Sequence, residues 1–311
     1  LFQQVVGEEV ANLGFDYVNG TRATLEPLRE LLDRYTDDFM PDLHVEWDDI
    51  SIDTLLAQND LETRWKFNIP SLCTVVEGVN AGHLVEIGAR SNVGKTSFHA
   101  SMIASPKGFA AQGANCMVLC NEEGSPRVGA RYLQACTGMS LMQIKENPKA
   151  AWDMYGKIRD NIFLKDVTGK DMGWVESVCK SYKPDIVVLD MGDKFATTQG
   201  FARTDEALKA NVVYARQIAK MYECAMFYMS QLSAEAEGKI QLNQAMMEGS
   251  RTGKAAEADL MILIAKNPPV DGVDGEEEST QRHLNVVKNK LSGWHGRIIC
   301  ELDYRTARYT A

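Results

Sequence analysis

The chain has 311 residues, 45% of them hydrophobic, and a formal net charge of −10 at pH 7, which leaves room for one large α/β domain and an accessory segment. None of its apolar runs approaches the ~20 residues of a transmembrane helix, and the N-terminus lacks the basic flank and cleavage pattern of a signal peptide. Seven cysteines without a Cys-x-x-Cys pair argue against a disulfide framework or a zinc site, so we expect a soluble protein of the reducing cytoplasm with no membrane partner.

The acidity belongs to the N-terminal segment, residues 1–62, which holds fifteen Asp and Glu against three Arg. Hydrophobic residues at helical spacing predict two short helices there, the first through Val10 and the second capped by Thr24 and closed by Pro41. We therefore expect an acidic helical segment over 1–62 and a separate domain over 63–311. The segment docks on that domain, on a neighbouring copy or on a basic partner, or it is only a solvated acidic surface.

Beyond residue 65, short apolar strands alternate with helical segments, a pattern typical of a mostly parallel sheet covered on both faces. The expected strands are Leu84–Ile87, Cys116–Cys120, Ile162–Lys165, Ile186–Leu189, Ala225–Met229, Leu260–Ile264, Leu284–Lys288 and Ile298–Leu302. The expected helices are Phe98–Ile103, Arg127–Thr137, Ala150–Asp160, Trp174–Tyr182 and Glu206–Tyr222. The predicted fold class is α/β, with a mostly parallel central sheet flanked by helices.

A loop of small and polar residues joins the strand Leu84–Ile87 to the helix Phe98–Ile103. In such an arrangement the backbone N–H groups of the loop and of the helix N-terminus wrap around a polyphosphate. Lys95 would neutralise the β- and γ-phosphates and the Thr96 hydroxyl would ligate Mg²⁺, so the loop predicts binding of ATP with Mg²⁺. The usual spacing asks for Gly where this chain has Ala89. The predicted nucleotide-binding residues are Ala89, Arg90, Ser91, Asn92, Val93, Gly94, Lys95, Thr96 and Ser97.

Two later strands end in carboxylates. Asp190 follows Ile186–Leu189, where phosphate-loop enzymes place an Asp that holds Mg²⁺ through water; capping of the next element is the alternative. Glu122 follows Cys116–Cys120, and a carboxylate at this point can polarise the water that attacks the γ-phosphate. Glu123 is the second choice for that role. The alternative is that both glutamates are merely exposed at the end of a strand.

Gln231 comes two residues after another apolar strand, Ala225–Met229. A neutral amide at this point can hydrogen-bond the γ-phosphate or the attacking water, and so report hydrolysis to the loop that follows. The interpretation depends on the place of Gln231 in the series of strand ends, because an isolated Ser-Gln pair carries little information.

Several of these segments together resemble the RecA-like ATPase domain of DnaB-type replicative helicases, including the ring helicases that phages encode. The phosphate loop of that family commonly reads Ala-Arg-Pro-Ser-Met-Gly-Lys-Thr, which includes the alanine found here at position 89. The resemblance covers residues 65–310. The matching segments are Ala89–Thr96, Glu122 with Arg131, Asp190 together with the sensor motif Ser230-Gln231-Leu232, and Gly249–Gly253.

This resemblance implies a ring of six subunits that hydrolyses ATP at the interfaces between copies and moves 5′ to 3′ on single-stranded DNA. It implies that Lys288 and Lys290, at the place of the family's Lys-x-Arg pair, act on the γ-phosphate bound to the neighbouring copy. Lysine keeps the charge of arginine but loses its planar fork. A solvated Lys-rich hairpin is the alternative. The implied protein partners are a primase, a polymerase or a helicase loader, in the cytoplasm of a bacterial host.

Two polar loops, 192–205 and 233–254, follow the metal and sensor strands. Their cationic side chains predict contacts to the phosphates of single-stranded DNA. Neither loop is rich in aromatic residues, which favours a grip that does not depend on base sequence. The predicted DNA-binding residues are Lys194, Arg203, Lys239, Arg251 and Lys254.

Two other interpretations share these motifs. A RecA- or RadA-like recombinase, or a clock-type ATPase, forms filaments or rings without unwinding DNA. A loader or structural adaptor with a degenerate ATPase site is the second, although the complete set of acids argues against it. Displacement of a strand from a forked duplex and DNA-stimulated ATP turnover distinguish a helicase from both.

Lys95→Ala should abolish ATP turnover, because the variant loses the charge that the loop motif brings to the β- and γ-phosphates. Release of inorganic phosphate from ATP measures the effect. Full activity in this variant would contradict the prediction of a phosphate loop.

Overall fold

The computed structural model describes residues 2–21, 24–29, 63–197, 203–249, 251–268 and 279–310. The chain forms two compact units, Leu1–Leu61 and Glu62–Ala311. The first unit contains α1 (Phe2–Val18), at the place of the first predicted helix, and a helical turn over 26–29. The rest of the second predicted helix, up to Pro41, lies outside the described residues.

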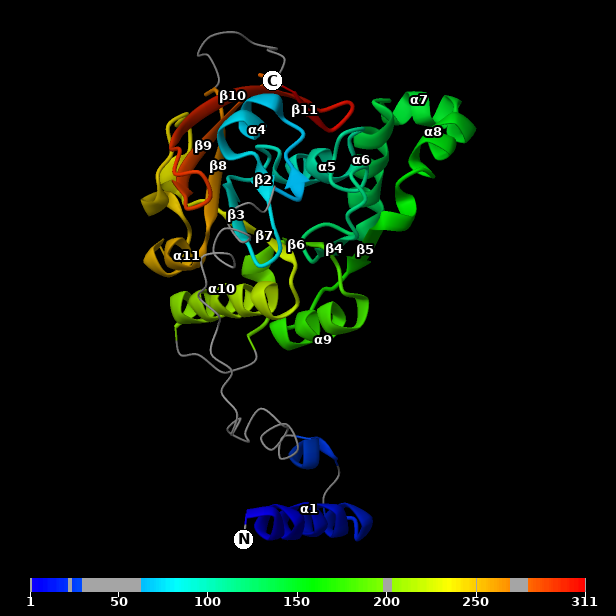
Figure 1. The fold of residues 1–311 in the computed structure, drawn as a ribbon, viewed down its shortest axis with the longest axis vertical. Helices are drawn as coiled ribbons and strands as arrows, with labels where there is room; N and C mark the ends of the chain where they lie inside the picture. The colour runs from blue at the N-terminus through cyan, green and yellow to red at the C-terminus, as the bar shows by residue number, and fades with distance from the viewer. Residues whose placement is uncertain are drawn as a thin grey trace, which may run out of the picture. The chain divides into compact units, whose positions relative to one another are not determined.

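Within its described part, the second unit is built on a nine-stranded sheet (Figure 1). Its parallel strands are β3 (Leu84–Ala89), β4 (Cys116–Cys120), β5 (Ile162–Asp166), β6 (Ile186–Asp190), β7 (Ala225–Gln231) and β8 (Leu260–Lys266). Three antiparallel strands extend one edge: β9 (Gln281–Asn289), β10 (Gly296–Asp303) and β11 (Arg308–Thr310). The order across the sheet is β11-β10-β9-β8-β3-β7-β6-β4-β5. The predicted mostly parallel α/β sheet is confirmed.

Eight strands of this sheet lie where the sequence predicts them. The sequence did not predict β11, nor a separate two-stranded sheet made of β1 (Trp65–Lys66) and β2 (Gly78–Val79) on either side of α4 (Pro70–Val76). These strands have only two or three residues, which is too short for an alternating apolar pattern to appear in the sequence.

Helices cover both faces of the parallel strands (Figure 1). Along β4, Cys116 and Val118 belong to the core shared with α5 (Lys95–Ala104) and α6 (Ser125–Thr137). Met117 and Leu119 belong to the core shared with α9 (Met172–Tyr182) and α10 (Thr204–Met221). Successive side chains of a strand point to opposite faces, so two covered faces require the nearly continuous apolar runs seen in the sequence.

Three shorter helices complete the described part of this unit: α7 (Leu141–Glu146), α8 (Pro148–Tyr155) and α11 (Arg251–Glu257). The helix predicted to reach Asp160 is wrong at its C-terminus. Gly156 follows α8, Ile158 turns into the core, and a 3₁₀ turn, η2 (Arg159–Asn161), begins. Among the described residues, none of the helices combines the length and the hydropathy of a membrane span.

A buried charged cluster lies between β3, β7 and α11. Glu86 of β3 is 1% exposed and accepts a hydrogen bond from Ser230 Oγ at 2.9 Å. Lys254 of α11 is fully buried, with its Nζ 2.5 Å from Asp193 Oδ1 and 3.2 Å from Ser230 Oγ. Burial raises the pKa of Glu86 to about 7; Lys254, Ser230 and Lys288 oppose this shift, and Asp193 adds to it. Glu86 therefore keeps its proton at pH values where an exposed glutamate has lost it.

The free energy of unfolding should fall as the pH rises from about 4.5 to about 7, because native Glu86 holds a proton that the unfolded chain has released. We expect this group to contribute a loss of about 3 kcal/mol over that range. Glu86→Gln keeps a neutral acceptor for Ser230 and should flatten the pH dependence, measured by urea unfolding. Glu301→Gln, at an exposed position of β10, should leave it unchanged. The same slope in Glu86→Gln as in the unmodified chain would contradict this assignment.

Candidate nucleotide-binding site

The loop between β3 and α5 has the backbone of a phosphate loop. Asn92 and Gly94 have φ angles of 59° and 112°, in the left-handed region. A Cβ atom on Gly94 would lie 2.8 Å from the Tyr309 hydroxyl, so glycine is required there. Ala89, where the usual spacing has glycine, is the last residue of β3 and pairs with Gln231 of β7. Regular strand backbone needs no glycine, so Ala89 leaves the loop intact.

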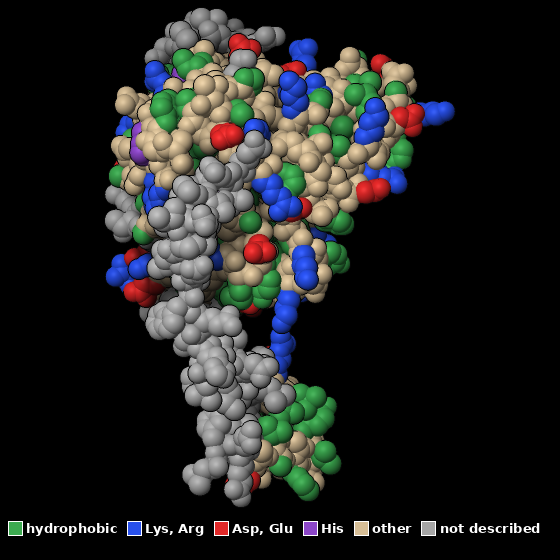
Figure 2. Space-filling model, viewed as in Figure 1, with side chains coloured by type: hydrophobic (Ala, Val, Ile, Leu, Met, Phe, Trp, Pro, Cys, Tyr) green, Lys and Arg blue, Asp and Glu red, His purple; other side chains and the backbone are tan. Residues whose placement is uncertain are grey.

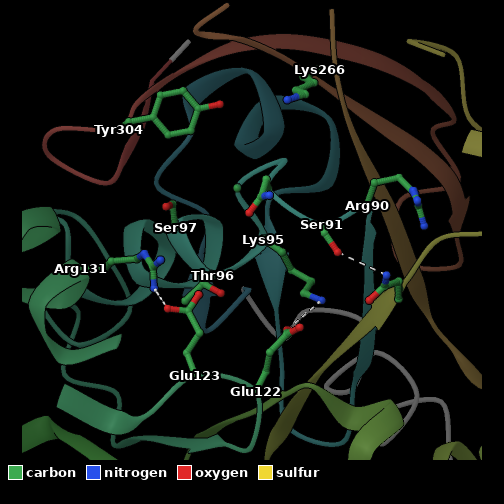
Figure 3. Close-up of a pocket in the computed structure, with 13 residues that line it drawn as sticks. Arg90, Ser91, Lys95, Thr96, Ser97, Glu122, Glu123, Arg131, Lys266 and Tyr304 are labelled. Atoms are coloured by element: carbon green, nitrogen blue, oxygen red, sulfur yellow. Dashed lines mark hydrogen bonds and ion pairs between the residues drawn. The ribbon is translucent and has the colours of Figure 1, made fainter. Parts of the chain in front are cut away.

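This loop forms one wall of a cavity of about 560 Å³ (Figure 3). Glu122 and Glu123, just beyond β4, lie on one side of it, and Tyr304 and Lys266 lie on the other. The sequence did not point to Tyr304 or Lys266, because neither belongs to a local motif. The lining residues are Arg90, Ser91, Asn92, Gly94, Lys95, Thr96, Ser97, Glu122, Glu123, Arg131, Gln231, Lys266 and Tyr304.

Glu122 contacts two lysine side chains. Its Oε2 lies 3.8 Å from Lys95 Nζ, and its Oε1 accepts a hydrogen bond from Lys194 Nζ at 3.1 Å (Figure 3 shows the first contact). Burial lowers the pKa of the Lys95 ammonium, and the carboxylates of Asp190 and Glu122 oppose that effect. Lys194, which the sequence assigned to DNA, thus binds the acid that stands next to the phosphate loop.

Asp190, at the end of β6, is buried and joins the phosphate loop to α5. Its Oδ2 accepts a hydrogen bond from Thr96 Oγ1 at 3.1 Å and lies 3.1 Å from His99 Nε2. The other ring nitrogen of His99 contacts the Tyr132 hydroxyl at 2.8 Å. Burial by itself would raise the pKa of Asp190, but His99, Lys95 and Thr96 together hold the pKa below its ordinary value. No sequence pattern singles out His99 within its helix.

The other carboxylate oxygen of this group, Asp190 Oδ1, is buried and has no hydrogen-bond partner among the described residues. A buried carboxylate oxygen is costly unless a cation or an ordered water lies beside it. The Thr96 hydroxyl is bound to the same carboxyl group, and hydroxyl, carboxylate and water oxygens are the ligands that Mg²⁺ prefers. The residues present therefore fit the predicted metal.

Glu123 is engaged by α6 instead of by the phosphate loop (Figure 3). Its Oε2 accepts a hydrogen bond from Arg131 Nη1 at 2.8 Å and lies 3.9 Å from Arg127 Nε. Two guanidinium groups thus neutralise Glu123, whereas Glu122 faces Lys95. The geometry favours Glu122, the first choice of the two predicted acids.

Gln231 connects the end of β7 to the phosphate loop. Its Nε2 donates to Ser91 Oγ at 3.4 Å, and its backbone N–H donates to Asp193 Oδ2 at 3.1 Å. Arg90, the neighbour of Ser91, forms an ion pair with Glu237 at 2.9 Å. The predicted sensor therefore contacts both the loop that would hold phosphates and the buried charged cluster.

Lys288 and Lys290 lie at the opposite end of the sheet from the phosphate loop. The end of β9 pairs with the start of β8, whereas the loop follows the end of β3, which runs parallel to β8. Lys288 Nζ donates to two carbonyl groups in the last turns of α11. Lys290 Nζ is 4.0 Å from Asp259 Oδ1, and its side chain is 52% exposed. Neither lysine lines the cavity of its own chain.

The other residues assigned to DNA differ in their placement. The prediction for Lys254 is wrong, because its ammonium is fully buried and paired within the buried charged cluster, out of reach of a phosphate backbone. Arg203 and Lys239 are exposed. The side chain of Arg251 lies outside the described residues. On the face drawn in Figure 2, the described Lys and Arg side chains of the Glu62–Ala311 unit are scattered instead of forming one basic patch.

Comparison with known proteins assigns these features to one family. The sequence model of the DnaB-like helicase C terminal domain matches residues 66–310. Among solved structures, the ATPase domain of a phage helicase is 18% identical with a TM-score of 0.70, over 85% of this chain and 99% of that one. A DnaB-like replicative helicase, described with its interactions with primase, is 14% identical with a TM-score of 0.71, over 99% of this chain and 76% of that one. At these identities the structural likeness establishes the fold alone. A search of curated protein sequences found no match.

Proposed function

Because the chain belongs to the family of DnaB-like helicase C-terminal domains, we propose that residues 63–311 form the motor of a ring that encloses single-stranded DNA and is driven by ATP hydrolysis. The chain carries the RecA-like ATPase domain of a DnaB-like replicative helicase, which is an ATP hydrolase. One observation carries the proposal: Lys95, Thr96 and Glu122 line a single cavity, and Asp190 is hydrogen-bonded to Thr96 at its edge.

ATP binds in this cavity with its phosphates on the loop N–H groups and on Lys95. Thr96 and Asp190 hold Mg²⁺, which supplies charge neutralisation at the β- and γ-phosphate oxygens. The base lies towards Tyr304. The guanidinium of Arg282 lies 4.9 Å from the centroid of the Tyr304 ring, so one face of the ring is covered and the other is free to stack on a nucleobase.

Glu122 acts as the general base that takes a proton from the attacking water. Its carboxylate is held by Lys194 and lies within 4 Å of the Lys95 ammonium, so a water bound to Glu122 is adjacent to the phosphate that Lys95 neutralises. Gln231 hydrogen-bonds the γ-phosphate and passes its loss to the second loop. The contacts of Gln231 with Ser91 and Asp193 support this role.

Lys288 and Lys290 complete the site of the neighbouring copy. Both lie at the end of the sheet away from their own phosphate loop, so they reach a γ-phosphate only across an interface between copies. Asp259, the carboxylate nearest to the Lys290 ammonium among the described ion pairs, is also bound by the guanidinium of Arg216 and by the N–H of Leu84. Lys290 is therefore weakly held in its own chain and available to a neighbour.

The loops 192–205 and 233–254 hold the strand through Arg203, Lys239 and Arg251. Lys194 and Lys254 are not part of this contact, because they are bound to Glu122 and to Asp193. So few cations per copy support a grip that sums over several copies around one strand and weakens steeply with salt. We expect six copies and 5′ to 3′ movement, as the resemblance implies.

The family match favours a helicase over the recombinase and adaptor alternatives. One structurally similar helicase is described with primase, so primase is the first partner to test, ahead of a polymerase or a loader. We also propose that the protein is phage-encoded and acts in the cytoplasm of a bacterial host.

Glu122→Gln should lower the turnover number for ATP by about 10²- to 10⁴-fold while ATP still binds, because the loss of a general base affects the chemical step. Glu123→Gln is the matched control: its partner is Arg131, so turnover should fall much less. Steady-state hydrolysis and equilibrium binding of ATP measure the two effects. A larger loss of turnover in Glu123→Gln would reverse the assignment of the base.

Rings assembled from equal amounts of Glu122→Ala and Lys290→Ala chains should recover about a quarter of the ATPase activity, because random mixing leaves that share of interfaces with both sides intact. Each variant alone should be nearly inactive. Mixtures of Glu122→Ala with Lys95→Ala, which damage the same side, should recover nothing. Absence of recovery in the first mixture would remove the support for a shared site.

A further inference from the structure

Two buried side chains of the antiparallel strands contact the backbone of the phosphate loop. Arg282 of β9 is fully buried, and its Nε donates a hydrogen bond to the Val93 carbonyl at 2.7 Å. Tyr309 of β11 is 3% exposed, and its hydroxyl donates to the Gly94 carbonyl at 3.1 Å. The two carbonyl groups that immediately precede Lys95 are thus each held by a side chain more than 180 residues away in the sequence.

The direction of these hydrogen bonds fixes the direction of the loop N–H groups. In a planar trans peptide the carbonyl and the N–H point to opposite sides. The Val93 carbonyl shares its peptide with the N–H of Gly94, and the Gly94 carbonyl shares its peptide with the N–H of Lys95. Gly94 and Lys95 line the cavity, whereas Arg282 and Tyr309 do not. Carbonyl groups held on the side of the antiparallel strands therefore turn the two N–H groups towards the cavity.

Packing alone does not explain an arginine at this place. A buried guanidinium is costly unless its N–H groups are satisfied, and an apolar side chain would fill a strand position without that cost. Arg282 is satisfied largely by carbonyl groups: besides Val93, its Nη1 donates to the carbonyls of Ser279 and Gln281 at 2.6 and 2.7 Å. The same guanidinium lies against the ring of Tyr304, which lines the cavity. One cation thus supports two walls of the site.

We propose that Arg282 and Tyr309 are positioning residues, which aim the N–H groups of Gly94 and Lys95 at the nucleotide phosphates by holding the carbonyl groups of Val93 and Gly94. This inference rests on the proposed role of the phosphate loop. The two residues touch no phosphate themselves. They keep the loop in its binding conformation before the nucleotide arrives, so that binding does not have to order it.

Tripolyphosphate with Mg²⁺ is the probe, because it has the phosphates of ATP and lacks the base that contacts Tyr304. Tyr309→Phe removes only the hydroxyl and keeps the ring that packs edge-on against Phe98 at 5.3 Å. Arg282→Lys keeps the charge and loses the fork. Calorimetric titration of the full chain should give about 3- to 15-fold weaker binding of tripolyphosphate for each variant, and ATP should weaken by at least that factor.

Arg308→Lys is the matched control. Arg308 lies beside Tyr309 on β11, but its guanidinium donates to the carbonyls of Ala135 and Cys136 in α6, away from the loop. Thermal unfolding should show destabilisation in Arg308→Lys comparable to that in Arg282→Lys, with unchanged binding of tripolyphosphate. Equal losses of binding in Arg308→Lys would mean that the loop responds to general destabilisation, and would overturn the proposal. If Arg282→Lys does not fold, Tyr309→Phe decides alone.

Lys95→Ala in the same titration separates this inference from the function on which it rests. Loss of tripolyphosphate binding in Lys95→Ala, with unmodified affinity in Tyr309→Phe and Arg282→Lys, overturns the positioning role and leaves the phosphate site in place. Retention of binding in Lys95→Ala overturns both. Weaker binding in all three variants, with normal binding in Arg308→Lys, supports both.

Discussion

The order of the parallel strands is the constraint on which the rest of the structure depends. β3 pairs with β7 and β8, and β6 and β4 follow beyond β7, so the carboxyl ends of these strands gather at one edge of the sheet. Thr96 and Asp190 are hydrogen-bonded although 94 residues separate them, and Ser91 and Gln231 although 140 do. Each motif supplies one or two groups, and only this strand order turns them into a site.

Buried charges then fix how these strand ends relate to one another. Asp190 is held between Thr96 and His99, and the Lys254 ammonium is held by Asp193. An unpaired ion at any of these positions would cost several kcal/mol, so each pair strongly favours one arrangement of the segments that it joins. The antiparallel strands add a second layer of support. By our proposals, β9 serves its own site through Arg282 at one end and the site of a neighbour near Lys290 at the other.

Much of the fold and about half of the chemistry could be predicted from local patterns. The apolar runs located the strands, and the loop before Lys95 identified the phosphate site even with Ala89 in an unusual place. Local patterns failed where a side chain's partner lies far away in the sequence. Lys254 in a polar loop has the composition of a DNA contact, yet its partner Asp193 draws it into the core. His99 looks like an ordinary helical residue until β6 brings Asp190 to it.

The sequence by itself determined the family, the α/β class and the identity of the phosphate loop, because strand and helix periods and a contiguous loop motif are written within a few residues. The tertiary structure alone decided which of two adjacent acids faces Lys95, since the choice depends on Arg131 reaching Glu123 from α6. It also decided that Lys194 belongs with Glu122, and that Arg282 and Tyr309 hold the loop from behind. Such contacts depend on strand order and burial, which no short stretch of sequence encodes.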